Sequence, residues 1–471
     1  MTSGRVAAMG CPHAIGVKES IVSHSTGTRV LRRGDEGYEQ ARRAVVWHAG
    51  APNRFPEVIV RARDEDDVMD AVRLARDEDR QMAVCSGHHS WSGSHLRDGI
   101  VLLDLAGLRD VSVDSEAMTA TLQPGVRGSE LGALLHERGL FFPVGHCEGV
   151  CVGGYLLQGG FGWRGRELGP SCMSVTGIDV VTADGNHTYA DGTRNPDLFW
   201  AARGAGPGFF GVVTRFHVKL YSLQPVTLTS FYLYPPDVWE EYLRWSRLIE
   251  PTLPAEVELW NLMYRDESVS SEGPVISVSA TAFVDTEERA REELTLFERC
   301  PVRDRALIAE VNRATTTSEL TARNTHYPPD RRFIADNTWT HASFDELLPG
   351  LRAIHQDFPP APTHLVWFPW TLTPQRPPMA YSVEDELYLA LYAGWEHPAD
   401  DETYRRWVTE RMRAMEPLAT GIQLADENLI NRPRRFVTED SLHRLDEIRA
   451  RYDPDGRFVS WLGRPQFAHA P

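Results

Sequence analysis

The stretch FPVGHCEGVCVGGYLLQGGFG, residues 142–162, sets a cysteine, Cys147, among closely spaced glycines. After Gly149, the stretch contains five more glycines, Gly153, Gly154, Gly159, Gly160 and Gly162. A residue without a Cβ lets the backbone lie directly against a flat ring or a pyrophosphate. A second stretch, SGHHS at residues 86–90, places His89 beside another glycine turn. Two reactive side chains on two such loops indicate a cofactor that the chain holds closely, with a covalent bond as one means of holding it.

A third glycine cluster occurs in DLFWAARGAGPGFFGVV, residues 197–213. Ordinary tight turns would explain one cluster, but three clusters in one part of the chain favour ligand binding. A Rossmann dinucleotide fold is excluded, because no G-x-G-x-x-G sequence opens a helix after the first strand with an acidic residue about 20 positions later. His146, Cys147 and Cys151 do not make a complete four-ligand set, so no metal site is predicted.

Length and composition limit the class of protein. With 471 residues, the chain exceeds the roughly 250–300 at which single hydrophobic cores stop growing, so at least two lobes are expected. The formal net charge is −17 and no basic stripe is present, which argues against nucleic-acid binding. No apolar run approaches the roughly 18 residues of a membrane span, and the N-terminus shows no apolar signal segment. A cytoplasmic protein without a membrane partner is therefore predicted.

The pattern of apolar residues divides the chain into four parts. Residues 1–50 are predicted to form an N-terminal arm with one short helix. Residues 51–222 alternate strands, such as VIVRA at 58–62, with amphipathic helices. Residues 223–420 combine aromatic strands with acidic, arginine-rich helices, and residues 421–471 are expected to return to the first lobe. The predicted fold class is α+β with two lobes, the first of them discontinuous.

Several motifs follow one another in a fixed order along the first part. They are SGHHS (86–90), FPVGHCEGVCVGG (142–154), VVTADG (180–185), DLFWAARGAG (197–206) and FGVVT (210–214). In this order they resemble the motifs of FAD-dependent oxidoreductases of the vanillyl-alcohol-oxidase, or p-cresol-methylhydroxylase, type, nearest the berberine-bridge-enzyme branch. The resemblance implies a discontinuous FAD-binding domain and a substrate-binding domain built on an antiparallel sheet.

The resemblance also implies roles for particular residues. His89 matches the histidine that bonds the flavin 8α-methyl group, and Cys147 matches the cysteine that bonds flavin C6. An imidazole nitrogen and a thiolate are nucleophiles able to make such bonds. The other residues expected to contact FAD are Ser86, Gly87, Ser90, Val150, Gly153, Gly154, Gly159, Gly160, Gly162, Gly211 and Val212. The chain departs from the family at His88 and Cys151, which replace glycines, so the local flavin contacts are expected to differ.

A catalytic base is absent from the position where the family carries one. Relatives that use a tyrosine carry it in Tyr-x-Asn-Tyr-x-Asp, whereas the matching residues 421–426 here are GIQLAD. In ELYLALYAGW, residues 386–395, strand alternation places Glu386, Tyr388 and Tyr392 on one face and three leucines on the other. Tyr388 is the predicted base, with Glu386 and Asp426 as further candidates.

The predicted activity is oxidation of a small organic molecule, either a secondary metabolite or a sugar-like alcohol. A hydride would pass to the flavin from a C–H bond next to oxygen, nitrogen or an aromatic ring, and O2 would reoxidise the flavin to give H2O2. In plant relatives a valine three residues after the linking cysteine goes with oxidases, and Val150 holds this position. The alternatives are a dehydrogenase with another electron acceptor and a non-redox isomerase or cyclase that uses the same pocket. No oligomeric state follows from the sequence.

Overall fold

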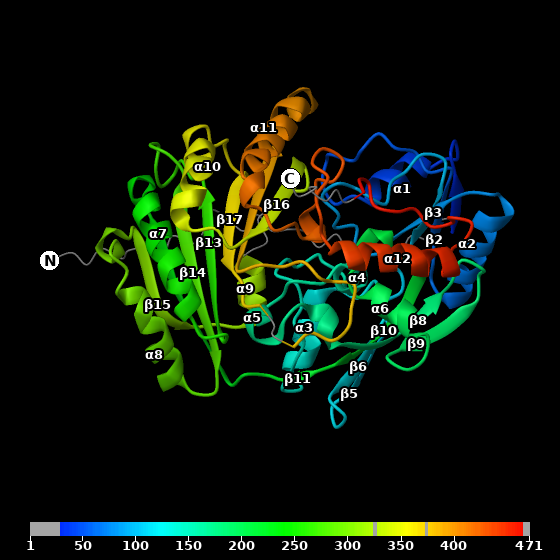
Figure 1. Ribbon diagram of the computed structural model, residues 1–471, viewed down its shortest axis with the longest axis horizontal. Coiled ribbons are helices and arrows are strands. Elements are labelled where there is room, and N and C mark those ends of the chain that lie inside the picture. The colour runs from blue at the N-terminus through cyan, green and yellow to red at the C-terminus, as the bar shows by residue number, and fades with distance from the viewer. Residues whose placement is uncertain (1–28, 324–326, 373–374, 465–471) are drawn as a thin grey trace.

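A computed structural model describes residues 29–323, 327–372 and 375–464 of the protein as two lobes lying side by side (Figure 1). In the described part of the chain, the first lobe, on the right of Figure 1, contains a four-stranded sheet, a five-stranded sheet and a two-stranded ribbon, and the second lobe contains one seven-stranded sheet. Residues 1–28 of the predicted N-terminal arm lie outside the described residues. The rest of the arm forms β1 (Val30–Arg32) and α1 (Tyr38–Ala44).

The first sheet of the first lobe has the strand order β1-β2-β4-β3, and β2, β4 and β3 run parallel. These strands are β2 (Val58–Arg61), β3 (Met82–Cys85) and β4 (Val101–Asp104). Helix α2 (Glu65–Asp77) follows Asp64, whose carboxylate accepts a hydrogen bond from the backbone N–H of Asp67 and so caps the helix. Because β3 ends at Cys85, the sheet fixes the point at which the loop with His89 begins.

The second sheet of the first lobe is antiparallel, with the order β5-β6-β10-β8-β9. Its strands are β5 (Val111–Asp114), β6 (Thr119–Leu122), β8 (Val175–Val181), β9 (His187–Asp191) and β10 (Val212–Lys219). The helices in this part of the chain are α3 (Gly128–His136), α4 (Val152–Leu157), α5 (Gly165–Leu168) and α6 (Pro196–Ala202), and α6 contacts β9. A two-stranded ribbon pairs β7 (Leu140–Phe141) with β11 (Tyr221–Ser222). Helix α4 starts directly after Cys151, so its first turn follows the loop that carries Cys147.

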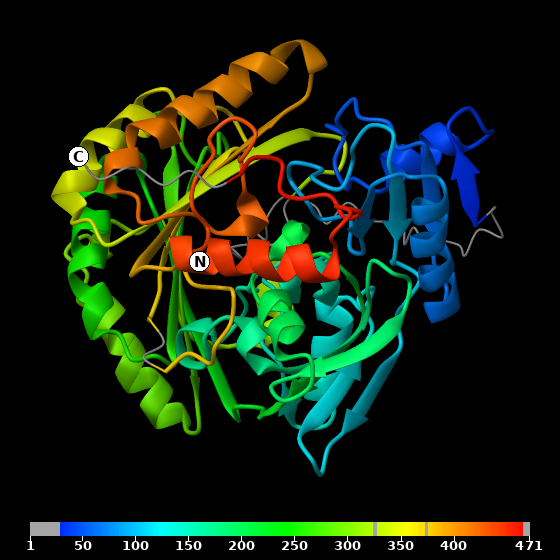
Figure 2. The same cartoon turned by 45° about the vertical axis from the view of Figure 1, so that its right-hand side comes forward.

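The second lobe is built on a seven-stranded antiparallel sheet with the order β15-β12-β14-β13-β17-β18-β16. Its strands are β12 (Val226–Tyr234), β13 (Val257–Tyr264), β14 (Val275–Val284), β15 (Ile308–Ala314), β16 (Arg332–Thr340), β17 (His364–Pro369) and β18 (Leu387–Trp395). Its helices are α7 (Trp239–Ile249), α8 (Glu287–Glu298), α9 (Thr317–Arg323), α10 (Phe344–Gln356) and α11 (Asp401–Ala414). Figures 1 and 2 show α7, α8, α10 and α11 along one side of this sheet, with the first lobe on its other side.

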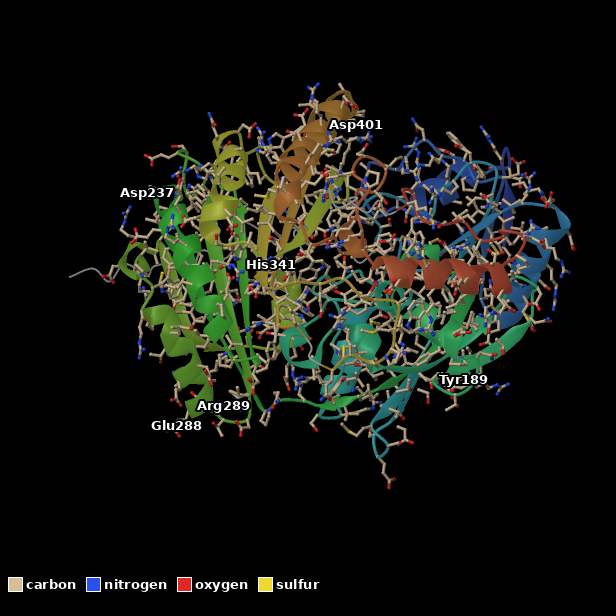
Figure 3. The ribbon with its side chains drawn as sticks, viewed as in Figure 1. Tyr189, Asp237, Glu288, Arg289, His341 and Asp401 are labelled. Atoms are coloured by element: carbon tan, nitrogen blue, oxygen red, sulfur yellow. The ribbon has the colours of Figure 1, made fainter. Side chains whose placement is uncertain are left out.

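Strand alternation determines what each face of the large sheet presents. On β18, Leu387, Leu389 and Leu391 enter the core beneath the helices, whereas Tyr388 and Tyr392 join an aromatic cluster on the opposite face. Exposed carboxylates such as Asp237 and Glu288 lie at the outer, helix-covered end of the lobe (Figure 3). The face directed at the first lobe carries Tyr388 and Tyr392, which the alternation of residues 386–395 places together on one face.

The chain returns to the first lobe at its C-terminal end. Helix α12 (Glu439–Tyr452) crosses in front of that lobe in Figure 1, and the backbone after it pairs with β3. The N–H of Met82 donates to the carbonyl of Arg457, and the N–H of Val459 donates to the carbonyl of Met82. The discontinuous first lobe and the antiparallel second lobe confirm the predicted fold class. No helix in the described part of the chain is long and apolar enough to cross a membrane.

Candidate active site

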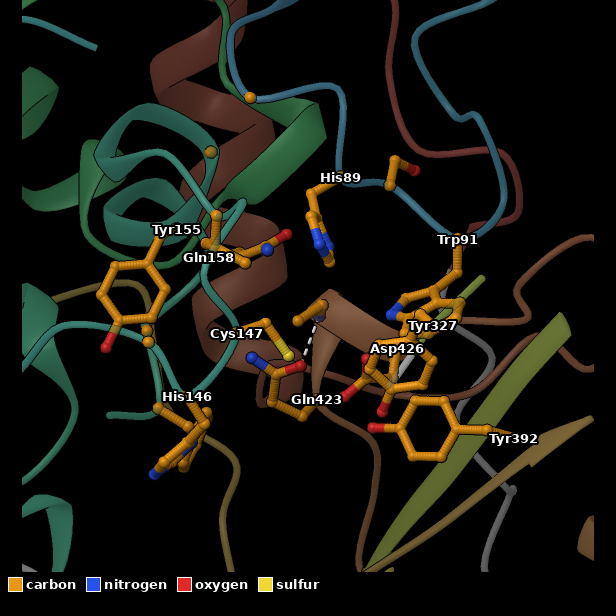
Figure 4. Close-up of a pocket in the computed structure, with 18 of the residues that line it drawn as sticks. His89, Trp91, His146, Cys147, Tyr155, Gln158, Tyr327, Tyr392, Gln423 and Asp426 are labelled. Atoms are coloured by element: carbon orange, nitrogen blue, oxygen red, sulfur yellow. Dashed lines mark hydrogen bonds between the residues drawn. The ribbon is translucent and has the colours of Figure 1, made fainter. Parts of the chain in front are cut away.

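A cavity of about 1540 Å³ lies between the lobes. Its walls are the glycine loops of the first lobe, the aromatic face of the large sheet, and residues 423–427 (Figure 4). Small-molecule sites usually measure about 300–1,000 Å³, so this cavity is large enough for a cofactor together with a substrate. Figure 4 shows His89 and Cys147 pointing into the same space, with Asp426 and Tyr392 to one side of it.

The two loops singled out in the sequence pack against each other. A Cβ added to Gly87 would lie 2.8 Å from the backbone nitrogen of Cys151, so only glycine fits there without a shift of the loops. A Cβ at Gly149 would lie 3.3 Å from Cδ2 of the His89 ring. Close packing of the loops therefore places the histidine beside the segment that carries Cys147.

The predicted flavin contacts fall into two groups. Those that line the cavity are Ser86, Gly87, His89, Ser90, Cys147, Val150, Gly153, Gly154, Gly160 and Gly211. At Gly154 a Cβ would meet no protein atom within 4 Å, so the missing side chain leaves open space in the cavity wall. Gly159, Gly162 and Val212 do not line the cavity; Gly159 packs against Tyr381, and Gly162 packs against the carbonyl of Val144. The wall thus offers backbone and small side chains to a large flat ligand, which fits FAD.

His89 is held among aromatic rings. Its imidazole lies parallel to the indole of Trp47, at 5.2 Å and 14°, and edge-on to that of Trp91, at 6.3 Å. Burial lowers the pKa of His89 to about 4, so the ring is neutral at physiological pH. A neutral imidazole keeps a free lone pair on one nitrogen, which is the form that can attack an electrophile.

The neighbouring residue His88 forms a hydrogen bond with Asp104. Its φ of 56° lies in the left-handed region, where glycine is favoured and histidine is among the tolerated exceptions. Its Nε2 lies 2.8 Å from Oδ1 of Asp104, and the ligand atoms of Cys85, His88 and Asp104 all lie within 4.8 Å of one another. These three side chains fall short of the four ligands of a closed structural zinc site.

Cys147 is a protonated thiol in this environment. Burial and, to a smaller extent, the negative charge of Asp426 together raise the pKa of Cys147 to about 12. His146, the preceding residue, packs edge-on between the indoles of Trp163 and Trp260, each at 4.5 Å. Burial lowers the pKa of His146 to about 3, so that ring is neutral and supplies no positive charge to the thiol.

Opposite the loops, the carboxylate of Asp426 accepts hydrogen bonds from aromatic side chains. The phenol of Tyr388 donates a hydrogen bond of 2.5 Å to Oδ2 of Asp426, and the side chains of Tyr392 and Trp91 also donate to this carboxylate. Burial raises the pKa of Asp426 above its usual range, and the three hydrogen bonds oppose that rise. Two of the three predicted base candidates, Tyr388 and Asp426, therefore form one hydrogen-bonded unit.

The third candidate, Glu386, lies elsewhere. It precedes β18, is 51% exposed, and pairs with Arg247 at 2.8 Å outside the cavity. The alternation of residues 386–395 holds only from Leu387 onwards, because the strand begins there. An exposed carboxylate keeps both its hydration and its arginine partner, whereas burial between aromatic rings would remove both.

Two site residues were not recognised in the sequence. The phenol of Tyr327 lies 3.0 Å from Nε2 of His364, and the His364 ring stacks on Tyr392 at 4.6 Å. The second residue is Trp47, which comes three residues after the end of α1 and stacks on the His89 ring. Neither Trp47 nor Tyr327 belongs to a periodic segment or a motif, so only the folded chain brings Tyr327 to the cavity and Trp47 against the His89 ring.

Comparison with known proteins agrees with this geometry. Residues 56–190 match a family model described as an FAD binding domain. The chain is 32% identical over 422 residues to the FAD-linked oxidoreductase nodO of Hypoxylon pulicicidum, covering 89% of this chain and 93% of that protein. It is 31% identical over 444 residues to the FAD-linked oxidoreductase ptmO of Penicillium ochrochloron, covering 92% and 96%.

Solved structures share the fold at lower sequence identity. The 6-hydroxy-D-nicotine oxidase of Arthrobacter nicotinovorans superposes with a TM-score of 0.80 at 22% identity, covering 92% of this chain and 97% of that chain. The grass pollen allergen Phl p 4, which has glucose dehydrogenase activity, gives a TM-score of 0.75 at 18% identity, covering 93% and 97%. Its isoleucine-to-valine variant, a glucose oxidase, gives a TM-score of 0.75 at 18% identity, covering 94% and 97%.

Proposed function

Because the chain belongs to the FAD-linked oxidoreductases, we propose that it is an FAD-dependent oxidase of a small organic molecule. The observation that carries the proposal is the placement of His89 and the Cys147 loop across one cavity from the Tyr388–Asp426 unit. When bound, FAD supplies the acceptor for a hydride from a C–H bond next to oxygen, nitrogen or an aromatic ring. The residues of the chain have to hold the flavin, take a proton from the substrate and leave a path for O2.

His89 and Cys147 are proposed to hold the flavin covalently. His89 suits this role because its ring is neutral and is oriented by Trp47. Cys147 faces the same space, but its thiol has to lose a proton before it can form a bond, and burial and the nearby charge of Asp426 oppose that loss. Attachment through His89 is therefore expected to precede attachment through Cys147.

Asp426 is proposed as the final acceptor of the substrate proton. A phenolate at Tyr388 would be buried beside a carboxylate, and burial, together with the charge of Asp426, raises the pKa of Tyr388 well above its usual value. Tyr388 can still relay the proton, because its oxygen can accept a proton from the substrate while its own proton moves to Oδ2 of Asp426. Since burial raises the pKa of Asp426, this carboxyl group holds a proton more readily than an ordinary one.

The choice of electron acceptor is proposed from Val150. This residue is half-buried and lines the cavity. In the pollen allergen, exchange of isoleucine for valine accompanies the change from a glucose dehydrogenase to a glucose oxidase. Val150 is the third residue after Cys147, the position at which plant oxidases carry a valine. This match supports O2 as the electron acceptor.

The test uses the purified flavoprotein. The flavin is expected to stay with the protein after acid precipitation, and peptide mapping should locate it at His89 and Cys147. After anaerobic photoreduction, mixing with air should restore the oxidised spectrum and release one H2O2 for each flavin. A reduced flavin that persists in air would instead identify a dehydrogenase, and flavin in the acid supernatant would overturn the covalent linkage.

A further inference from the structure

The central strands of the large-sheet face that borders the cavity are poor in strongly polar groups, whereas Glu310 and Arg313 of the edge strand β15 line the cavity beyond them. Five neighbouring strands, in the order β12-β14-β13-β17-β18, contribute side chains to the cavity wall. Among the described residues of these five strands that line the cavity, none carries a carboxylate, an amide or a guanidinium group. A ligand lying across these five strands therefore meets rings, aliphatic side chains and hydroxyl groups, apart from the imidazole of His364, and reaches charged side chains of the sheet only at the β15 edge.

The middle of this face is an apolar patch made by two strands. Trp260 and Leu262 of β13 lie beside Phe368 and Val366 of β17, with Leu262 and Val366 directly paired in the register. The rings of Trp260 and Phe368 are 4.9 Å apart. A polar group placed over this patch would lose its hydration without gaining a hydrogen-bond partner.

Two serines lie beyond the patch, on β14. Ser279 pairs with Trp260 on one side and with Phe231 on the other, and Ser277 pairs with Leu262. Both serines line the cavity, and Ser277 is only 7% exposed. Neither side-chain hydroxyl hydrogen-bonds to any described residue. The two hydroxyl groups are open to the cavity rather than sealed in the protein, so this pair can bind a polar group of a ligand.

The register fixes how far the serines lie from the proton-accepting unit. Strand β14 is separated from β18 by β13 and β17, and Tyr388 of β18 pairs with Phe368 of β17. Neighbouring strands are about 4.8 Å apart, so three spacings place the serines about 14 Å from Tyr388. The apolar patch occupies the space between these two polar positions.

We propose that the substrate is an elongated, largely apolar molecule with an oxygen function at each end. Its reacting end carries an ionisable hydroxyl group at the Tyr388–Asp426 unit, and a hydroxyl or carbonyl group at the far end binds Ser277 and Ser279. This inference rests on the proposed oxidase function and specifies the substrate class. An oligosaccharide fits less well, because its hydroxyl groups are distributed along its whole length and several would lie over the apolar patch.

The test measures binding to the purified flavoprotein by anaerobic equilibrium dialysis. The probe is 17β-oestradiol, a rigid apolar molecule with a phenol at one end and an alcohol at the other; its analogue without the 17-hydroxyl group and cellobiose serve as comparisons. Oestradiol should bind about tenfold more tightly than the analogue, because the analogue leaves the serine hydroxyls unpaired. Cellobiose should bind more weakly than both.

A double-mutant cycle tests whether the two serines cause the tenfold difference in affinity between oestradiol and its analogue. In the Ser277→Ala/Ser279→Ala variant, oestradiol and its analogue should bind equally, whereas Ser112→Ala, an exposed serine on β5, should keep the tenfold difference. Tighter binding of cellobiose, or an unchanged tenfold difference in the double variant, would overturn the proposal. The comparison of the two steroids needs no variant, so equal affinity of the unmodified protein for both would overturn it as well.

Photoreduction and reoxidation of the flavin in the same preparation distinguish a failure of the proposed oxidase function from a failure of the proposed substrate class. A flavin that cycles with O2 in a protein that does not bind the steroid would leave the oxidase standing and reject the substrate class. A flavin that does not cycle would reject the oxidase, whatever binds.

Discussion

The imidazole of His89 lies parallel to the indole of Trp47, with ring centroids 5.2 Å apart and an angle of 14° between the planes. Trp47 comes from the segment after α1, and its backbone N–H donates to the carbonyl of His88. The N-terminal segment therefore sets the orientation of a ring that the glycine loop alone would leave free to turn. Trp47 acts in this sense as a positioning residue for the proposed flavin link.

Replacing Trp47 by alanine should slow attachment of the flavin by about tenfold, since aromatic pairs contribute up to about 1.5 kcal/mol beyond buried area. The measurement is the time course of acid-stable flavin after FAD is added to the apoprotein. Trp47→Phe keeps a ring for stacking and serves as the matched control. Attachment at the original rate in Trp47→Ala would show that the loop orients His89 without help.

Gly87→Ala should destabilise the protein by about 1–3 kcal/mol, because the new Cβ would lie 2.8 Å from both the backbone nitrogen and the Cβ of Cys151. Thermal unfolding and flavin content measure the effect. Gly192→Ala is the control, since Gly192 is exposed and has no atom within 4 Å of its added Cβ. Equal stability of the two variants would mean that the two loops separate easily.

What the sequence predicts well is what periodicity and ordered motifs encode. The leucine and tyrosine faces of β18 follow from alternation, and the meeting of the His89 and Cys147 loops follows from motifs that occur together in order. The partnership of Tyr388 with Asp426 could not be derived in this way. It joins a strand to a loop 38 residues later, and no local pattern encodes that contact.

Asp426→Asn should lower the rate of flavin reduction by about 10²- to 10⁴-fold, the usual contribution of a general base. In the unmodified protein this rate should rise with pH as Asp426 loses its proton, with a midpoint above the ordinary value of 3.8 because burial raises the pKa of this carboxyl group. The variant should lack that rise. Anaerobic stopped-flow reduction across pH, with any substrate that gives peroxide, measures both effects.

Tyr388→Phe and Tyr392→Phe complete this test. Loss of the relay should make Tyr388→Phe slower than Tyr392→Phe, although each variant removes one hydrogen bond to Asp426. If Asp426→Asn retained both the rate and its rise with pH, another group would have to be the proton acceptor.

Val150→Ile should slow reoxidation of the reduced flavin by about tenfold or more, equivalent to about 1.4 kcal/mol of added barrier, while reduction by substrate stays unchanged. The added methylene narrows the space at a cavity-lining position. Photoreduced protein mixed with air-saturated buffer gives the rate directly. Val126→Ile, on a buried residue that does not line the cavity, is the control for general packing effects. An unchanged reoxidation rate would remove Val150 from the argument for an oxidase.

Glu258→Gln should stabilise the protein, and more strongly as the pH rises. Burial raises the pKa of Glu258 to about 8 from an ordinary value of 4.5, while one carboxylate oxygen accepts the N–H of Gly165 at 2.9 Å and the other has no partner among the described residues. Because the folded state binds this proton more tightly than the unfolded state, the free energy of unfolding falls as pH rises from about 4.5 to about 8.

Glutamine keeps an oxygen for the Gly165 N–H and carries no charge. The free energy of unfolding of the variant, relative to that of the unmodified protein, should therefore grow across this pH range by about a few kcal/mol, the order that the raised pKa of Glu258 implies. Thermal midpoints of both proteins at pH 5, 6, 7 and 8 measure the trend, with Glu288→Gln, an exposed residue, as the control. A difference in midpoint between Glu258→Gln and the unmodified protein that stays constant with pH would show that Glu258 is not titrating there. The carboxylate would then have to be stabilised by the guanidinium groups of Arg164 and Arg166, whose charges lower the pKa of Glu258.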